Sequence, residues 1–143
     1  MTHKPLSGKV TWQGTLYKGL HTSHDGSFSL YESECPAGSG PPRHVHQRED
    51  ETFYILSGSV DFWIDGSRAT KGAGDVVHVP RGTEHTFRVG DAGPARMLTV
   101  LTPGGFEGFF VEMAERNCRI PDDMPVVAAI AGAYNLAFTG PPI

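Results

Sequence analysis

Turn-forming residues interrupt this chain about every eight to twelve residues, so they leave room only for short elements. The 143 residues include 18 Gly and 11 Pro. Asp25-Gly26 and Asp65-Gly66 are hairpin signals, and a Gly/Pro loop covers residues 36–42. The segments between the turns are rich in aromatic and β-branched residues, which favour strands. The pattern predicts an all-β fold, either a sandwich or a small barrel.

The expected strands precede Thr102, where the character of the chain changes. We expect one or two strands within residues 7–20, a strand that carries two histidines, and further strands at 28–32, 51–56, 60–64, 76–79, 85–89 and 96–101. No repeat or second domain is evident. We therefore divide the chain into a β-barrel over residues 1–112 and a tail over residues 113–143.

The residues after Thr102 are expected to form short helices. A turn near Phe106 leads into a short helical segment that ends at Arg116. In a second expected helix, Val126, Ile130 and Tyr134 are four apart and share one face. We expect this face to pack in the core or against a dimer partner. The remaining residues are expected to form an extended segment on the barrel or on a neighbouring chain.

Charge and composition exclude several function classes. The formal net charge is −4 and no block of Lys or Arg occurs, which argues against nucleic acid and anionic membranes as partners. No apolar run approaches the roughly 20 residues that span a bilayer, and the first residues do not resemble a secretory signal. Cys35 and Cys118 form no Cys-x-x-Cys pair, so we expect a cytoplasmic location.

Three residues in one short stretch suit a metal. His44 and His46 are two apart, so both imidazoles leave the same face of an extended strand. Glu51 opens the next strand after a polar turn. Two imidazoles and one carboxylate on adjacent strands form most of a ligand set for a divalent transition metal. The fourth ligand is expected at His85.

The same alternation predicts the neighbours of the metal. Phe87 and Val89 share the face of His85, and Phe53 and Ile55 share that of Glu51. On the strand between them, Phe62 also points inward. These five residues are the predicted substrate pocket, an apolar cavity with a metal at one end. Packing in the core is the alternative role for the three phenylalanines.

Several of the polar residues near the predicted metal site could have a purely structural role. The four ligand candidates could merely fill the barrel interior. His78 is the one further histidine expected to be able to reach the cavity. Glu49 and Asp50 are most simply a solvated acidic turn, with Asp50 as a substitute ligand if the spacer is one residue shorter. No hydrolase, P-loop or dinucleotide-binding motif occurs in the chain.

Two segments resemble the motifs of the cupins, a family of small barrels. The first motif, a glycine, five residues, His-x-His, a spacer, Glu, six residues and a glycine, is matched by Gly38, His44, His46, Glu51 and Gly58. The second, a glycine, five residues, Pro-x-Gly, two residues, His, three residues and Asn, is matched by Gly74, Pro80, Gly82 and His85. Val89 replaces the last Asn, which leaves the ligand set intact but removes a polar inward side chain.

The resemblance implies an antiparallel jelly-roll β-barrel with a short helical C-terminal tail. It also implies one divalent transition metal per chain, held by His44, His46, Glu51 and His85, with up to two positions open. Fe, Mn, Ni, Co, Cu and Zn all suit these ligands, and the sequence does not choose among them. Glu51 would have a second, catalytic role, since a carboxylate that loosens from the metal can accept a proton from a bound hydroxyl.

The C-terminal part adds a further resemblance, to single-domain cupins grouped with quercetin dioxygenases, in residues 102–110 and 138–142. It implies a homodimeric enzyme that acts on a small, partly apolar substrate as a quercetinase-type dioxygenase, with O₂ as co-substrate. Two alternatives stay open. One is a non-redox isomerase, lyase or polyketide-cyclase-like cupin, and the other is a ligand-binding cupin without turnover.

Overall fold

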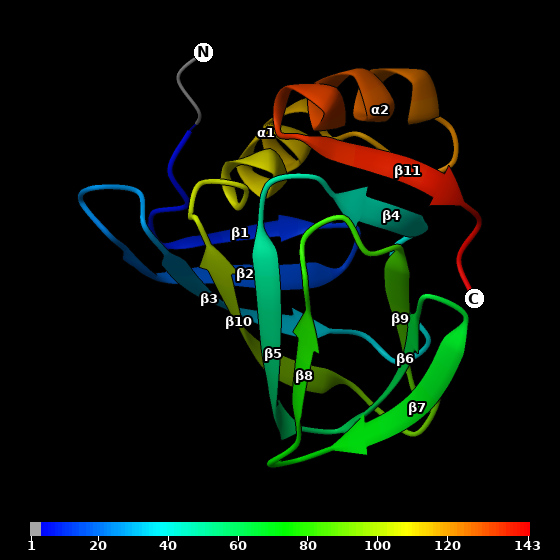
Figure 1. Cartoon of the computed structure of the whole chain (residues 1–143). Coiled ribbons are helices and arrows are strands. Elements are labelled where there is room, and N and C mark those ends of the chain that lie inside the picture. The colour runs from blue at the N-terminus through cyan, green and yellow to red at the C-terminus, as the bar shows by residue number, and fades with distance from the viewer. Residues whose placement is uncertain (1–3) are drawn as a thin grey trace.

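Two antiparallel sheets face each other in the computed structural model of the protein, which describes residues 4–143 (Figure 1). One sheet has six strands in the order β1-β2-β3-β10-β5-β8, and the other has five in the order β11-β4-β9-β6-β7. The predicted all-β jelly-roll barrel with a short helical tail is confirmed. The first three residues of the predicted barrel range lie outside the described residues.

The strand bounds follow the predicted turns closely. The six-stranded sheet consists of β1 (Lys9–Trp12), β2 (Thr15–Thr22), β3 (Ser29–Cys35), β10 (Ala95–Thr102), β5 (Asp50–Ser57) and β8 (Val76–Val79). The five-stranded sheet consists of β11 (Leu136–Gly140), β4 (Arg43–His46), β9 (His85–Val89), β6 (Ser59–Ile64) and β7 (Ser67–Gly72). Asp65-Gly66 joins β6 to β7 as the hairpin signal predicts, with both residues at positive φ.

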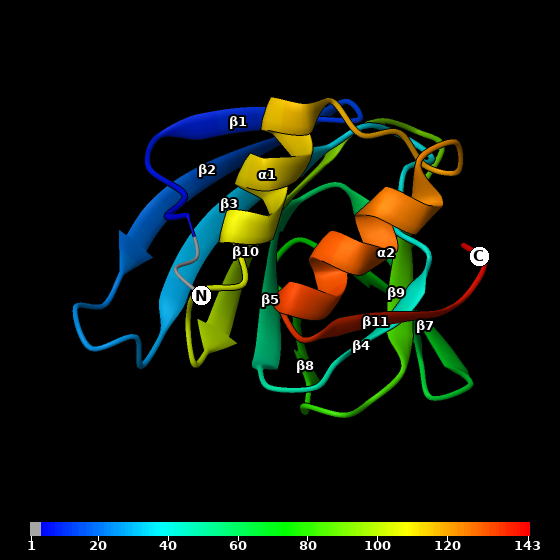
Figure 2. The same cartoon turned by 90° about the horizontal axis from the view of Figure 1, so that it is seen from above.

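Two short helices lie over one end of the barrel (Figure 2). They are α1 (Gly108–Arg116), which contacts β1, and α2 (Met124–Ala133), which contacts β11. Of the predicted stripe, Tyr134 is buried and Ile130 packs against the tail-side core, whereas Val126 is 47% exposed. Val127 and Ala131 are the buried residues within the helix itself. No helix within residues 4–143 is long and apolar enough to cross a membrane.

The end of the chain is a strand of the barrel. The sequence predicts an extended segment here but not its partner, which is β4, the strand that carries the two histidines. Leu136 pairs with His46 and Phe138 pairs with His44, antiparallel. The tail therefore completes the sheet on which two candidate ligands stand.

Buried apolar side chains form two clusters. The barrel cluster joins both sheets toward the β5–β6 turn and consists of Cys35, Phe53, Ile55, Val60, Phe62, Val77, Val79, Val89, Ala95 and Met97. The tail cluster joins the helices to the six-stranded sheet and consists of Leu6, Trp12, Tyr31, Leu101, Phe106, Phe109, Met113, Cys118, Val127, Ala131, Tyr134 and Leu136. The candidate site lies between these two clusters.

Candidate metal centre

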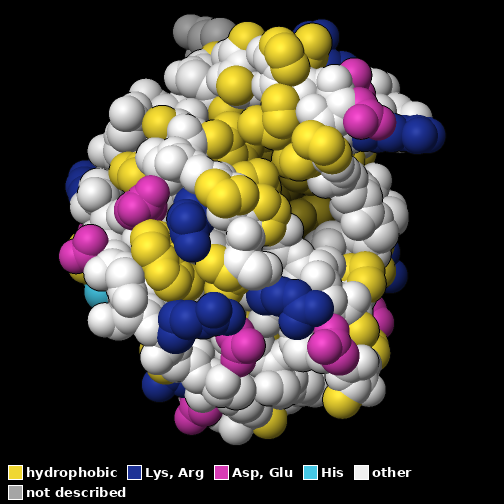
Figure 3. All heavy atoms as spheres, turned by 90° about the vertical axis from the view of Figure 1, so that its right-hand side faces the viewer, with side chains coloured by type: hydrophobic (Ala, Val, Ile, Leu, Met, Phe, Trp, Pro, Cys, Tyr) yellow, Lys and Arg dark blue, Asp and Glu magenta, His cyan; other side chains and the backbone are white. Residues whose placement is uncertain are grey.

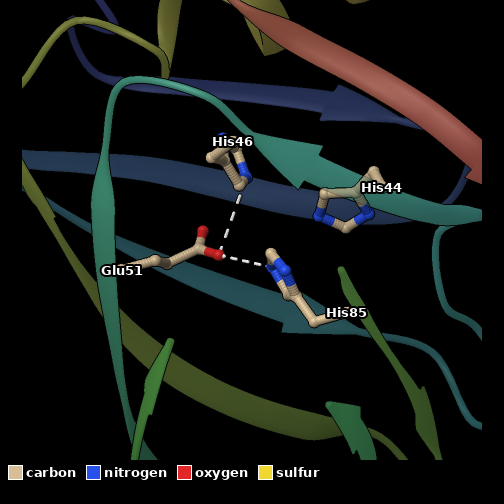
Figure 4. A group of neighbouring side chains, drawn as sticks. All are labelled: His44, His46, Glu51 and His85. Atoms are coloured by element: carbon tan, nitrogen blue, oxygen red, sulfur yellow. Dashed lines mark hydrogen bonds and ion pairs between the residues drawn. The ribbon is translucent and has the colours of Figure 1, made fainter. Parts of the chain in front are cut away.

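Four buried side chains from three strands meet inside the barrel (Figure 4). His44 and His46 come from β4, Glu51 from β5 and His85 from β9. One ligand atom from each lies within 4.8 Å of the others, and each residue is at most 7% exposed. All four residues predicted as ligands are therefore in one place, in an arrangement that could hold a metal ion.

Strand pairing and one turn bring the two motifs together. His44 faces His85 directly in the β4–β9 pair, and β4 alternates between half-buried and buried residues so that both histidines point inward. The N–H of Gly82 donates a 2.8 Å hydrogen bond to the carbonyl of His46. Gly82 has φ +80°, a conformation that strongly favours glycine. The Pro-x-Gly turn thus ties the second motif to the histidine strand.

Backbone carbonyls orient two of the imidazoles. His44 Nδ1 lies 2.8 Å from the carbonyl oxygen of Pro42, and His85 Nδ1 lies 2.9 Å from that of Thr83. Because a carbonyl only accepts, each Nδ1 carries the proton and donates it. In the neutral ring this leaves the Nε2 lone pair free, which is the form that binds a metal.

The carboxylate of Glu51 is at the centre of the group. Its Oε1 lies 3.0 Å from His85 Nε2 and 3.6 Å from His46 Nε2. Burial raises the pKa of Glu51, but the charges of His46 and His85 and the hydrogen bond from His85 outweigh it and lower the pKa to about 2. Glu51 is therefore ionised at neutral pH.

The histidines respond to the same environment. Burial lowers the pKa of His44 to about 3, and the neighbouring His85 and His46 lower it further, so His44 is neutral. Burial lowers the pKa of His85 too, but its hydrogen bond to Glu51 and the Glu51 charge give a net increase. His85 Nδ1 donates its hydrogen bond to Thr83, so the lone pair of His85 Nε2 faces a carboxylate oxygen of Glu51. A proton or a metal cation between these two atoms is needed to relieve their repulsion. These residues fit a divalent transition metal, which needs neutral imidazoles and ionised carboxylates.

A cavity of about 430 Å³ adjoins the cluster, and His44, His46 and Glu51 lie in its wall. Its volume is in the range of small-molecule sites. Two predicted pocket residues, Phe53 and Phe87, line it, together with Met97. Figure 3, which views the molecule from the right-hand side of Figure 1, shows a hollow lined with hydrophobic side chains. The barrel thus offers an apolar chamber that reaches the candidate metal ligands.

Three predicted pocket residues are placed in the core and not on the cavity wall. Ile55 and Val89 are 0% exposed and Phe62 is 1% exposed, all within the barrel cluster. Phe62 packs behind Phe53 and Phe87, with ring centroids 5.2 and 5.8 Å away. Alternation gives the correct face of each strand, but it does not tell where along the strand the cavity ends.

The sequence pattern did not assign the phenylalanines after Thr102 to the pocket. Phe106, Phe109 and Phe110 line the cavity, and the Phe106 ring lies 4.5 Å from that of His46, edge to face. Tyr17 and Tyr31 line it from the six-stranded sheet. The sequence signal for these residues is the density of phenylalanines in 106–110, where the spacing predicts only a turn and a short helical segment.

The remaining candidates have other partners. His78 is exposed on β8 and bonds Thr52 at 2.9 Å, so it does not reach the cavity. Asp50 binds Arg81 through the backbone N–H and the guanidinium, and this hydrogen bonding lowers the pKa of Asp50. Glu49, expected in a solvated turn, is 4% exposed. That expectation is wrong for Glu49.

Fold and site together define a small jelly-roll barrel with a buried cluster of three histidines and one glutamate that could hold a metal. A model of the cupin domain matches residues 31–101 of the chain. The protein belongs to the cupins and is similar to quercetin dioxygenases.

Two relatives are quercetin 2,3-dioxygenases. The enzyme of Bacillus subtilis is 42% identical over 86 residues, which is 60% of this chain and 25% of that protein. The enzyme of Aspergillus japonicus is 34% identical over 117 residues, which is 76% of this chain and 33% of that protein. This chain thus spans about a quarter to a third of the length of these relatives. Among solved structures, the polyketide cyclase RemF from Streptomyces resistomycificus has a TM-score of 0.56 and 28% identity, with 68% of each chain covered.

Proposed function

We propose that this protein is a metal-dependent dioxygenase of quercetinase type that acts on a small, largely apolar, hydroxylated substrate. One observation carries the proposal: the cluster of His44, His46, Glu51 and His85 lies beside an apolar cavity of about 430 Å³. The similarity to two quercetin 2,3-dioxygenases supports the choice of reaction.

The cluster would hold one divalent transition metal per chain. When bound, such a metal supplies Lewis-acid polarisation of an enol or phenol oxygen and redox chemistry with O₂. The Nε2 atoms of His44 and His85 are set for this ligation by the hydrogen bonds at Nδ1. The apolar wall excludes water and offers Phe53, Phe87 and Phe106 as surfaces on which an aromatic substrate packs.

Glu51 is the proposed proton acceptor. It is the one carboxylate among the four clustered residues, and it lies in the cavity wall. Burial raises the pKa of Glu51, but the neighbouring histidines lower it on balance, so Glu51 is ionised and able to accept a proton from a bound hydroxyl.

Metal analysis and oxygen uptake test this proposal. Protein purified without a nickel column should contain close to one Fe, Mn, Ni, Co or Cu per chain, and should consume O₂ with a flavonol. Glu51→Ala should abolish uptake. Stoichiometric metal without O₂ uptake from any flavonol or catechol would contradict the dioxygenase.

A non-redox metal enzyme is the second candidate. The similarity to the polyketide cyclase RemF favours it, because 28% of aligned residues are identical over 68% of this chain. The same cluster would then polarise a substrate carbonyl. Product formation by the zinc-loaded protein without O₂ consumption would identify this reaction. Saturable binding of a flavonol without any product would instead indicate a ligand-binding cupin.

We also propose a homodimer and a cytoplasmic location. Tyr54 and Val76 are cross-strand neighbours at the β8 edge of the six-stranded sheet, and they are 43% and 57% exposed. A second copy would cover this edge. Light scattering coupled to gel filtration should give twice the chain mass, and the mass of one chain would contradict the dimer. The free, buried thiols of Cys35 and Cys118 suit a reducing compartment.

A further inference from the structure

Glu49 is a buried acid outside the ligand cluster. It lies in the turn between β4 and β5 and is 4% exposed. Its Oε1 lies 3.7 Å from His46 Nδ1. Within residues 4–143, neither atom has a hydrogen-bond partner, and both are shielded from solvent. Two polar atoms therefore face each other across a gap slightly longer than a hydrogen bond.

A second buried glutamate shows what an acid with a structural role looks like here. Glu107 is 2% exposed. It accepts hydrogen bonds from Ser29 Oγ at 2.8 Å, from the Gly105 N–H at 2.9 Å and from Thr22 Oγ1 at 3.3 Å. Burying a carboxylate is costly unless it is paired in this way. Glu49 Oε1 has no such set of donors, so its burial needs another reason.

The three ligand histidines differ in what orients them. His44 and His85 each donate Nδ1–H to a backbone carbonyl. His46 has no carbonyl in that place, and the group that faces its Nδ1 is the Glu49 carboxylate. An acceptor at Nδ1 favours the tautomer with the proton on Nδ1 and leaves Nε2 with its lone pair. On the other side of the ring, Nε2 points to Glu51 Oε1 at 3.6 Å.

We propose that Glu49 is the positioning residue of His46. Once the 3.7 Å gap closes to hydrogen-bond length, its carboxylate would accept a hydrogen bond from His46 Nδ1–H and so fix the tautomer and the ring orientation that present Nε2 to the metal. A carboxylate behind a ligand imidazole also makes the imidazole a stronger donor to the metal. The proposal rests on the proposed metal site, but it concerns a residue outside the motif ligands.

The charge of Glu49 has a counterpart nearby. The hydrogen bond and the charge of Asp50 raise the pKa of the Arg81 guanidinium, and the charge of Glu49 adds to this rise. Arg81 itself is paired with Asp50, whose Oδ1 lies 3.2 Å from the Arg81 Nε. Asp50→Asn serves as the control variant, since it alters the residue next to Glu49, at the start of β5, without removing the acceptor behind His46.

The first measurement is zinc affinity, by competition with a chelating dye, in wild type, Glu49→Ala, Glu49→Gln and Asp50→Asn. Loss of an outer hydrogen-bond partner weakens metal binding by about 10- to 100-fold. We expect this loss in Glu49→Ala, a smaller loss in Glu49→Gln because the amide oxygen still accepts, and no more than about a threefold change in Asp50→Asn. Equal losses in Glu49→Ala and Asp50→Asn would overturn the proposal, because they would reflect a disturbed turn.

The second measurement is the tautomer of His46 in the metal-free protein, read from imidazole ¹⁵N shifts. Wild type should show the proton on Nδ1, and Glu49→Ala should show a mixture, while His44 and His85 keep their tautomers. An unchanged His46 tautomer together with unchanged zinc affinity would overturn the proposal. This readout separates two failures: a wild type that binds no metal refutes the proposed function, whereas the metal-free tautomer still decides the role of Glu49.

Discussion

The two ends of this barrel share strands β5 and β9 but differ in what their inward positions carry. Toward the β5–β6 turn, the barrel cluster is apolar and closely packed, with Ile55, Val60 and Val89 at 0% exposure. At the other end of β5 and β9, and on β4, inward positions carry three imidazoles and a carboxylate next to a cavity. Fold stability should therefore come from the first end and chemistry from the second. Substitutions at the two ends can separate these contributions.

The largest loss of stability is expected from Phe62→Ala in the barrel cluster. Phe62 is 1% exposed and packs against Phe53 and Phe87, so its removal leaves a cavity in the core. Such truncations cost about 3–5 kcal/mol. Urea unfolding followed by circular dichroism measures this cost. Tyr54→Ala, at a residue that is 43% exposed, is the control and should change stability much less. Equal costs would remove the distinction between core and surface.

A smaller loss is expected from Val89→Asn, which restores the residue of the family motif. Val89 is 0% exposed within the barrel cluster, so the amide would be buried there. An unpaired buried polar group costs about 1–3 kcal/mol. The metal content of the folded protein should stay unchanged, because Val89 does not line the cavity. A large loss of metal would show that this position is coupled to the ligands.

The smallest loss of stability is expected from His44→Ala, although it should remove the metal. His44 donates one hydrogen bond to Pro42, and such bonds contribute about 1 kcal/mol. The variant should keep the circular dichroism spectrum of wild type, while elemental analysis after reconstitution finds little metal. His85→Ala should also lose the metal. Unfolding of both variants on purification would mean that the ligand end also supports the fold.

The sequence was a good guide where local rules decide the structure. Alternation places His44, His46 and Phe53 inward, and the spacing of two motifs identifies His85 as the fourth clustered residue. These features depend on strand geometry and on nearest-neighbour pairing, which a linear pattern records.

Features that depend on the exact path of a turn or on distant pairing were missed. Glu49 looks like part of a polar turn, but the path from β4 to β5 turns it toward His46. Within α2, Val127 is buried instead of Val126, because the face that packs inward is set by tertiary contacts that residue spacing does not record. Phe106 reaches the cavity only because the chain after Thr102 folds back over the end of the barrel. No local sequence pattern predicts this path of the chain.

The pairing of β11 with β4 also has a consequence for the order of events during synthesis. About 90 residues separate Leu136 from its partner His46. Ribosomes add roughly 5–20 residues per second, so the histidine strand waits about 5–20 s for its neighbour. Until then β4 is an open edge on that side, and Leu136 and Phe138 are missing from the cavity wall. The finished geometry of the proposed metal site therefore exists only after translation of residues 136–140, and the nascent chain is the stage at which another strand could pair with β4.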